Sequence, residues 1–156
     1  QTTPLSGNHQ LLLDQVNAFN RAKGEMDENG HDLTLTLSRV AHVAANASER
    51  DRKITAAHRY YGRFDNVRDG PGLVKNGIIQ ELPCETPIGE LGKSLLICTT
   101  QEMIDKLGPY SDLGIDRVIL NMNFGLEAQE TLDSIQIFGE DVMPHFSKNS
   151  SAMAAQ

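Results

Sequence analysis

The segment 99–146 constrains the fold most, because it predicts a helix, a strand and a second helix joined by short links. Thr99 and Glu102 form a Thr-x-x-Glu capping box at the start of the first helix. Residues 118–122 are a short apolar run with branched side chains, which favours a buried strand. Since parallel strands are joined through crossover helices, this segment predicts part of a parallel α/β sheet.

Apolar residues recur at helical spacing in both helices of this segment. The stripe of the first helix consists of Met103, Ile104, Leu107 and Tyr110. The stripe of the second helix consists of Leu132, Ile135, Phe138 and Val142. Gly114 follows the first helix, where a left-handed residue is favoured, and Pro144 ends the second. Both stripes are expected to face the core.

The rest of the chain predicts further elements of the same kind. Residues 9–29 are expected to form a helix, and 33–44 alternate between apolar and polar residues as a strand does. A helix is expected to run from a cap at Ser48 to about Phe64. Residues 65–94 contain many glycines and prolines, which predict an irregular insertion, and 95–97 predict a short strand.

Three sequence patterns carry a resemblance to a known family. The patterns are T-x-x-E-M-I-D-K-L-x-x-Y-x-D-L-G-I-D-x-V-I-L and F-G-E-D-V-M-P-H-F, with S-R-V-A-x-V-A further upstream. They resemble the C-terminal end of the bacterial-luciferase-like, flavin-dependent monooxygenases. Cys98 and Thr100 depart from that family, which usually has Gly and Pro at these positions.

The resemblance implies a fold that this chain would share with a longer protein. Residues 1–148 would be the C-terminal part of a (β/α)8 TIM barrel, with its last two barrel strands and their helices. Within it, 65–94 would be an irregular insertion or lid, and 149–156 a frayed tail. Members of the family are about twice as long, so we expect a C-terminal portion that needs its missing N-terminal barrel portion or self-association.

The resemblance also implies an activity. The family uses reduced FMN, supplied by a flavin reductase, and O2 to oxygenate a small organic substrate. The expected function is therefore that of an FMN-dependent monooxygenase, an oxidoreductase, inactive without its N-terminal part. The alternative is a non-catalytic flavin-binding or assembly module derived from the same family. An unrelated small α/β enzyme is disfavoured, because the sequence has no nucleophile elbow, phosphate loop or metal motif.

Composition limits the partners and the compartment. The formal net charge of −7 argues against a nucleic-acid surface. No apolar run is long enough to span a bilayer, so no membrane partner is expected. Cys84 and Cys98 do not make a disulfide framework, which favours free thiols in the cytoplasm. The histidines lack metal-ligand spacing, so no metal site is expected.

Two residues of the strand at 33–44 are candidates for catalysis, although the catalytic residues stay unassigned. Arg39 interrupts an apolar strand, where it would hold an anionic flavin group or form a structural ion pair with a carboxylate. His42 would serve as an acid or base near neutral pH, or it would be a core histidine with satisfied hydrogen bonds.

Other polar residues are candidates for cofactor contacts. Asn121 and Asn123 would reach a flavin at the end of the last strand, or they would stabilise the following turn. Lys75 would sit on a lid over the flavin. The arginines at one face of the second predicted helix would form a phosphate or partner site, or a solvated surface; they are Arg52, Arg59 and Arg63.

Overall fold

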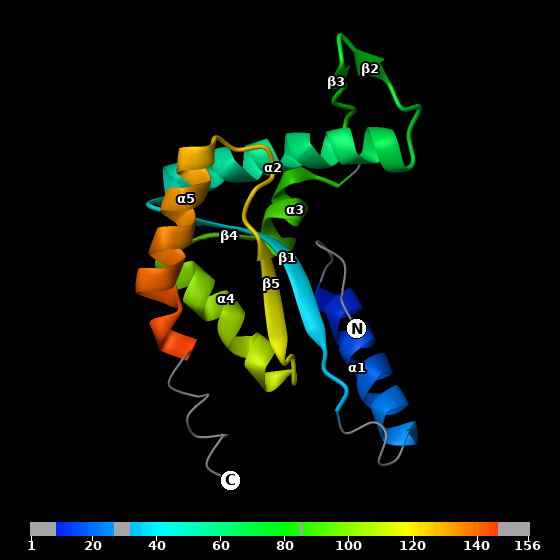
Figure 1. Ribbon diagram of the computed structural model, residues 1–156, viewed down its shortest axis with the longest axis vertical. Helices are drawn as coiled ribbons and strands as arrows, with labels where there is room; N and C mark the ends of the chain where they lie inside the picture. Colours follow the sequence, from blue (N-terminus) through cyan, green and yellow to red (C-terminus); the bar gives the residue numbers. More distant parts are fainter. Residues whose placement is uncertain (1–8, 27–31, 85, 147–156) are drawn as a thin grey trace.

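The computed structural model describes residues 9–26, 32–84 and 86–146, and a three-stranded parallel sheet forms its centre (Figure 1). Strand β1 (Thr36–Ala44) lies between β4 (Leu96–Thr99) and β5 (Arg117–Asn121). The expected α/β fold with a parallel sheet is confirmed. The sequence predicted two barrel strands, but the run at 96–99 joins the same sheet as a third strand, because it pairs with the second half of β1.

Helices cover the two faces of β1, because alternate residues of a strand point to opposite sides. On one side, Ala41 and Val43 pack with α4 (Thr100–Asp112) and with the π-helix η2 (Phe138–Val142). On the other side, Val40 packs with α2 (Ala47–Arg68) and α3 (Ile88–Ser94). The strand is therefore buried along its whole length.

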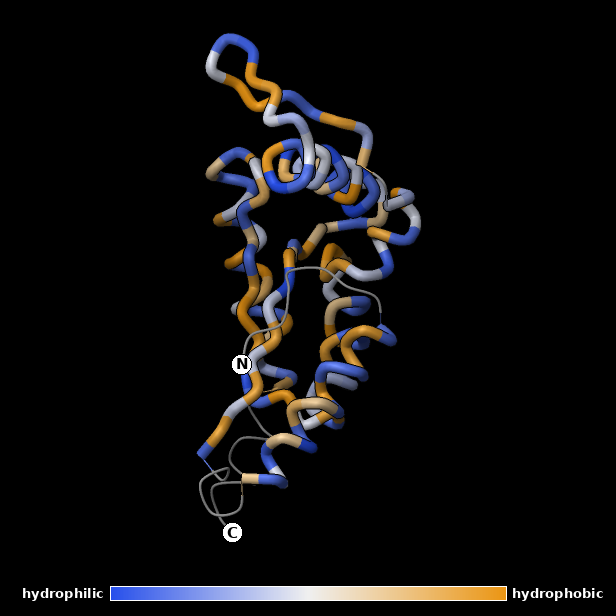
Figure 2. Tube along the Cα trace, turned by 90° about the vertical axis from the view of Figure 1, so that its right-hand side faces the viewer, coloured by the Kyte–Doolittle hydropathy of each residue, from blue (hydrophilic) through white to orange (hydrophobic). Residues whose placement is uncertain are grey.

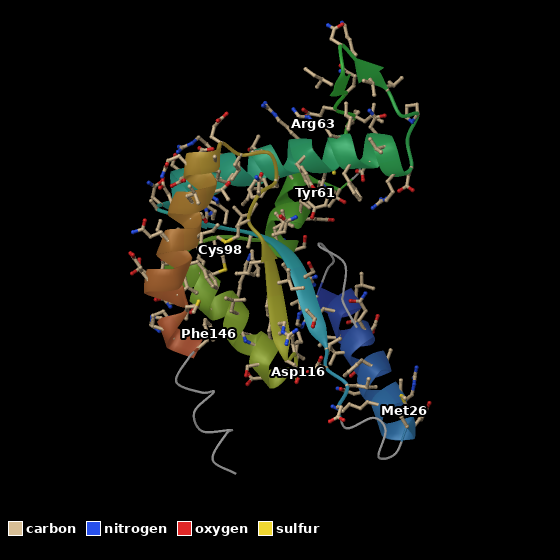
Figure 3. The ribbon with its side chains drawn as sticks, viewed as in Figure 1. Met26, Tyr61, Arg63, Cys98, Asp116 and Phe146 are labelled. Atoms are coloured by element: carbon tan, nitrogen blue, oxygen red, sulfur yellow. The ribbon has the colours of Figure 1, made fainter. Side chains whose placement is uncertain are left out.

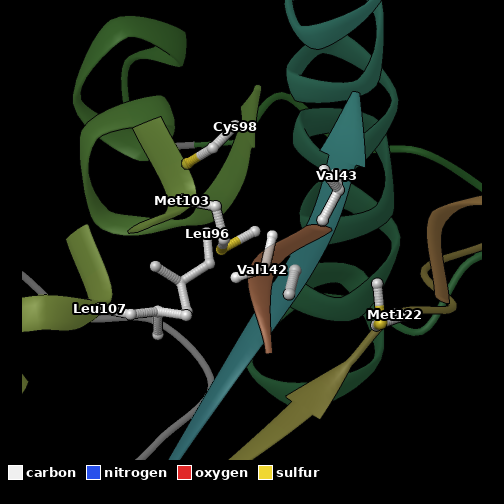
Figure 4. Packing of buried hydrophobic residues seen from close by; sticks show 8 residues of the cluster. Val43, Leu96, Cys98, Met103, Leu107, Met122 and Val142 are labelled. Carbon is white, nitrogen blue, oxygen red and sulfur yellow. The ribbon is translucent and has the colours of Figure 1, made fainter. Parts of the chain in front are cut away.

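The core between β1 and α4 contains the predicted stripe of α4. Figure 4 shows Met103 and Leu107 of α4 against Leu96 of β4 and Val142 of η2. Met103 and Val142 are fully buried. A buried side chain of this size contributes roughly 1.5–3 kcal/mol to folding, so this packing holds the two ends of the predicted segment 99–146 together.

The helix α1 (His9–Glu25) packs beside the first half of β1. Its predicted stripe of Leu12, Val16 and Phe19 is buried against Leu35 and Leu37. Residues 27–29, which the sequence placed in this helix, lie outside the described residues.

The helix α2 begins earlier and ends later than the sequence indicated. Its N-terminal cap is Asn46, whose side-chain oxygen accepts a hydrogen bond from the backbone of Glu49 at 3.0 Å. The expected cap at Ser48 is therefore wrong, because Ser48 already lies in the first turn. The helix continues past Phe64 and ends at Arg68, and a hairpin follows it in the chain.

The hairpin β2 (Val74–Lys75) and β3 (Ile78–Ile79) corrects the expectation of an irregular segment at 65–94. Its two-residue turn has positive φ at Asn76 (53°) and Gly77 (76°), the combination that favours a tight type I′ hairpin. Figures 1 and 2 show the hairpin projecting beyond α2, away from the sheet. The sequence signal was the Asn-Gly pair itself.

The helix α5 (Ala128–Ile137) corrects the predicted second stripe of segment 99–146. Leu132 is 57% exposed and Ile135 is 47% exposed, whereas Ser134 and Val142 are buried. The switch from α-helix to the π-helix η2 changes which residues face the core, and a uniform helical period does not anticipate it. None of the helices in the described ranges combines the length and apolar character that a membrane span requires.

Candidate functional site

His42 lies near the carboxyl end of β1, at the edge of a parallel sheet where ligands usually bind. Its side chain is 1% exposed, and its Nε2 lies 3.5 Å from Oε1 of Glu49. The ring meets Phe124 edge-on, with 6.3 Å between ring centroids. Within the described part of the chain, the buried Nδ1 atom has no hydrogen-bond partner. A buried nitrogen without a partner is uncommon in native proteins.

Glu49 is held in place from the backbone side. Its Oε2 accepts a hydrogen bond from the backbone of Ala45 at 2.9 Å, while its own amide donates to Asn46. These bonds fix the carboxylate at the start of α2, where the helix dipole also favours a negative charge. Glu49 is therefore placed to orient the imidazole of His42.

An ion pair lies beside His42 and joins two helices. Lys53 of α2 forms an ion pair with Glu130 of α5. The Lys53 side chain is 6% exposed and that of Glu130 is 45% exposed. The hydrogen bond from Lys53 lowers the pKa of Glu130, which keeps the carboxylate charged. We call His42, Glu49, Lys53 and Glu130 the His42 cluster.

The environment of His42 disfavours its charged form. Burial lowers the pKa of His42, and the nearby Lys53 charge acts in the same direction, while Glu49 opposes both. A neutral imidazole is therefore expected at pH 7, with one nitrogen available as an acceptor. The cavities described below are lined by other residues. This geometry makes His42 a packed residue of the core rather than one that meets solvent.

Arg39 does not join the His42 cluster. It lies on the opposite side of β1 from His42, since the two positions differ in parity. Its Nη1 donates to the carbonyl of Ser38 at 2.9 Å, and the side chain is buried. Burial lowers the pKa of Arg39, and interaction with the hydroxyl of Tyr110 partly offsets this effect.

The other candidates from the sequence are also dispersed. Asn121 is paired in register with Val40, on the side of the sheet that carries His42, and is half-buried. Asn123 is exposed, and its Oδ1 accepts a hydrogen bond from the backbone of Gly125 at 3.0 Å, which is the turn-stabilising role. Lys75 lies on the projecting hairpin, away from the strand ends (Figure 1). The structure therefore does not bring these residues to one site.

A cavity of about 620 Å³ opens beside β4, between α2, α3 and α4. We call it the β4 cavity. Its apolar wall includes Ile54, Ile97 and Cys98, the last of which is labelled in Figure 3. The charged residues that line it are Arg50, Asp51, Lys93, Glu102, Asp105 and Lys106. This volume lies within the range of small-molecule sites.

The predicted insertion contributes to this cavity, but through α3 rather than through the hairpin. Ile88, Gly89 and Gly92 of α3 line the β4 cavity. The capping box at the start of α4 lies on its far side, where the backbone of Thr99 donates to Glu102 at 2.9 Å. Glu102 also forms an ion pair with Arg50, so these two side chains are held in place at the polar rim of the cavity.

Cys98 is not positioned as a nucleophile. Burial raises the pKa of its thiol, an effect that the charge of Lys106 only partly offsets. The reactive form of cysteine is the thiolate, which a raised pKa disfavours. Neither Cys98 nor Cys84 forms a disulfide within the described residues.

Two further concave regions occur in the described structure. A groove of about 580 Å³ lies at the amino end of β5, and its wall includes Tyr110, Phe138 and Phe146. Figure 3 labels Phe146 and Asp116 at this end of the molecule. A smaller pocket of about 330 Å³ lies on the outer side of α2, beside Phe124 and Gly125 of the loop after β5.

Sequence reasoning missed most of the His42 cluster. Glu49 follows His42 by seven residues and carries a capping signal, because Asn46 precedes it by three. Lys53 and Glu130 are far apart in the chain, and no local pattern reveals their pairing. Such long-range ion pairs depend on how α2 and α5 pack, which periodicity does not specify.

Within the described residues, no group of three or more acidic, histidine or cysteine side chains is arranged to hold a metal ion. The chain matches no protein-family model. It also matches none of the curated proteins with which it was compared.

Proposed function

We propose that this chain is the C-terminal part of a luciferase-like monooxygenase that uses reduced FMN and O2 to oxygenate a small organic substrate. The observation that carries the proposal is the β4 cavity, which opens beside a strand of the parallel sheet and between α2, α3 and α4. Ligands of parallel α/β sheets usually bind outside the carboxyl ends of the strands, and Glu102, just after the carboxyl end of β4, is one of the residues that line this cavity. The sequence patterns of segment 99–146 supply the resemblance to the family.

The residues of the β4 cavity suit a flavin ring. Ile54 and Ile97 offer an apolar wall for the ring, and Lys93, which lines the same cavity, offers a cation for the negative charge that a reduced flavin carries. Flavin chemistry, once the cofactor is bound, supplies the activation of O2. The role of this chain would be to bind the ring, orient it and exclude water.

The candidate residues on β1 would act indirectly in this proposal. His42 is buried away from the β4 cavity, so we assign it to the positioning of α2 through Glu49. Arg39 packs on the other side of β1, near Tyr110. Neither residue is assigned a contact with flavin or substrate.

The barrel itself belongs to the proposed complete protein. In a (β/α)8 barrel, neighbouring strands follow one another along the chain. Here β5 pairs with β1 rather than with β4. The proposal therefore requires a different strand order in the complete protein, where both edges of β4 would be paired, whereas here only the edge beside β1 is paired.

Binding of FMN to the purified chain tests the proposal. Gly89 lines the β4 cavity, and a Cβ atom added there meets nothing within 4 Å, so Gly89→Trp should fill the cavity without disturbing the backbone. Gly24→Trp, at an equally open position of α1, is the matched control. We expect Gly89→Trp to abolish binding of oxidised and anaerobically reduced FMN, and Gly24→Trp to preserve it. Failure of the unaltered chain to bind either form would overturn the proposal.

A second assay separates the enzyme from its alternative, a non-catalytic flavin-binding or assembly module. The chain is supplied with NADH, a flavin reductase, O2 and a panel of aldehydes, ketones and sulfonates. An oxygenated product that depends on an open β4 cavity would favour the monooxygenase. Flavin binding without any product, also after addition of the N-terminal portion, would favour the module.

A further inference from the structure

The outer side of α2 concentrates positive charge around a small pocket. The pocket of about 330 Å³ is lined by Arg52, Arg59 and Arg63, together with Phe124 and Gly125 from the loop after β5. Thr55 and Ala56 complete its wall, so no acidic residue lines it. Figure 3 shows Arg63 on the side of α2 away from the sheet. We call this region the arginine pocket.

The cations of the arginine pocket differ from the other arginines of α2 in their partners. Arg50 pairs with Asp51 and Glu102, and Arg68 pairs with Asp65 and Asp69. In the arginine pocket, Arg52 donates to the hydroxyl of Ser48 at 3.2 Å.

Arg59 and Arg63 form no side-chain hydrogen bond or ion pair with any residue that the structure describes. Like charges one turn apart on a helix repel each other. This clustering is unexpected in a chain whose formal net charge is −7. A bound anion would relieve the repulsion and use the free donors of both guanidinium groups.

We propose that the arginine pocket binds the phosphate monoester group of a small molecule. A guanidinium group matches two oxygens of a phosphate at once, and two such groups on one helix face can hold the same anion from two sides. The pocket, at about 330 Å³, has room for a phosphate group and a small part of the molecule that carries it. The negative chain disfavours a polyanion such as a nucleic acid.

The position of the pocket supports a ligand rather than a solvated surface alone. Phe124 is buried and follows β5, so one wall of the pocket comes from a loop at the carboxyl end of a strand, where ligands of such sheets usually bind. Thr55 lines both the arginine pocket and the β4 cavity. The phosphate could therefore belong to the flavin of the proposed function or to another phosphorylated molecule, and only the first of these assignments rests on that function.

Calorimetric titration at low ionic strength tests the proposal with inorganic phosphate, FMN and riboflavin, which lacks the phosphate. We expect phosphate to bind, and Arg59→Gln or Arg63→Gln to weaken its binding by roughly tenfold each. Arg68→Gln is the matched control, because Arg68 lies on the same helix outside the pocket and is paired with acids. We expect this control to leave the affinity unchanged.

Two outcomes would overturn the arginine pocket as a phosphate site. One is no binding of phosphate to the unaltered chain. The other is an equal loss of affinity in Arg59→Gln and Arg68→Gln, which would indicate a general effect of charge.

The titrations with FMN and riboflavin distinguish this inference from the proposed function. FMN that displaces phosphate and loses affinity in Arg59→Gln, while riboflavin binds weakly, would identify the flavin phosphate as the ligand. Phosphate binding that depends on Arg59, without any binding of FMN, would keep the pocket and overturn the proposed function. The chain could instead bind FMN but no phosphate, with FMN binding blocked by Gly89→Trp. This result would keep the proposed function and overturn the phosphate site.

Discussion

The inner and outer faces of α2 differ in whether their polar side chains have partners within the protein. On the inner face, Lys53 and Asn66 are buried, and each is matched by partners from elsewhere in the chain. On the outer face, Arg59 and Arg63 are exposed, and no described residue pairs with them. Burial demands a partner for a polar group, whereas water can serve an exposed one. Partners on the inner face therefore explain stability, whereas the exposed cations of the outer face are available to a ligand.

Of the substitutions that test this comparison, Asn66→Ala should cause the largest loss of stability. The Asn66 amide donates to the carbonyls of Leu73 and Gln80 at 2.9 and 2.8 Å, and its oxygen accepts from the backbone of Leu73 at 2.8 Å. At about 1 kcal/mol for each hydrogen bond, we expect a loss of about 3 kcal/mol in the free energy of unfolding. Urea denaturation measures the loss, and faster proteolysis at 69–82 should accompany it.

Asn20→Ala, on an exposed position of α1, is the control for this prediction. Its free energy of unfolding should hardly change. Equal effects of the two substitutions would mean that the base of the hairpin does not depend on Asn66.

Glu130→Gln should have the second largest effect and should exceed Lys53→Met. Loss of the carboxylate leaves the buried Lys53 charge without its partner, whereas loss of the ammonium leaves a carboxylate that is 45% exposed to water. We expect about 2 kcal/mol for Glu130→Gln and about 1 kcal/mol for Lys53→Met. A double-mutant cycle by urea denaturation measures the coupling, and additive effects would contradict the ion pair.

The pH dependence of stability should report on His42. Burial lowers the pKa of His42 in the folded chain below its ordinary value of 6.5. The unfolded chain therefore binds more protons between these two values, so stability should fall as the pH drops below about 6.5. The loss is at most about 1.4 kcal/mol per pH unit for one proton, and it ends below the folded pKa.

His42→Gln should remove the pH dependence in this window. Glu49 and Lys53 of α2 and Glu130 of α5 are the charged groups that act on His42. The pKa of Glu130 is lowered from 4.5, so its contribution to stability is lost only at more acidic pH. An unchanged slope near pH 6 in His42→Gln would assign the effect to another group.

Substitutions on the outer face should have the smallest effects on stability. Arg59→Gln and Arg63→Gln remove exposed charges without described partners, so we expect changes below about 0.5 kcal/mol. Removal of one like charge could even raise stability slightly. Thermal unfolding without phosphate measures this, and a large loss would mean that these arginines serve the fold rather than a ligand.

Local patterns predicted many elements of the fold. The capping box at Thr99, the apolar stripe of α4 and the left-handed Gly114 all act within a few residues, and all three are present. The strand order was not predictable, because pairing of β1 with β5 depends on contacts between distant segments. The exposure of Leu132 and Ile135 was also missed, since it results from the change of helix type after Ile137.

The candidate sites were harder to predict than the elements. His42 and Arg39 were identified as unusual polar residues of a buried strand, and both are buried. Their opposite orientations followed from the strand period, but their partners come from α2 and α4. The arginine spacing on α2 was visible in the sequence, whereas the loop at Phe124 that turns this face into a pocket was not.

The central place of β1 has a consequence for the order in which the chain folds. Both neighbours of β1 come later in the sequence, after α2 and after α4. During synthesis, β1 therefore leaves the ribosome before β4 and β5, the two strands with which it pairs here. Pairings between such distant segments are slow to form, because a long loop must close first. Until these strands emerge, the apolar residues of β1 lack the neighbours that bury them here, and such transiently exposed strands promote aggregation of a newly made chain.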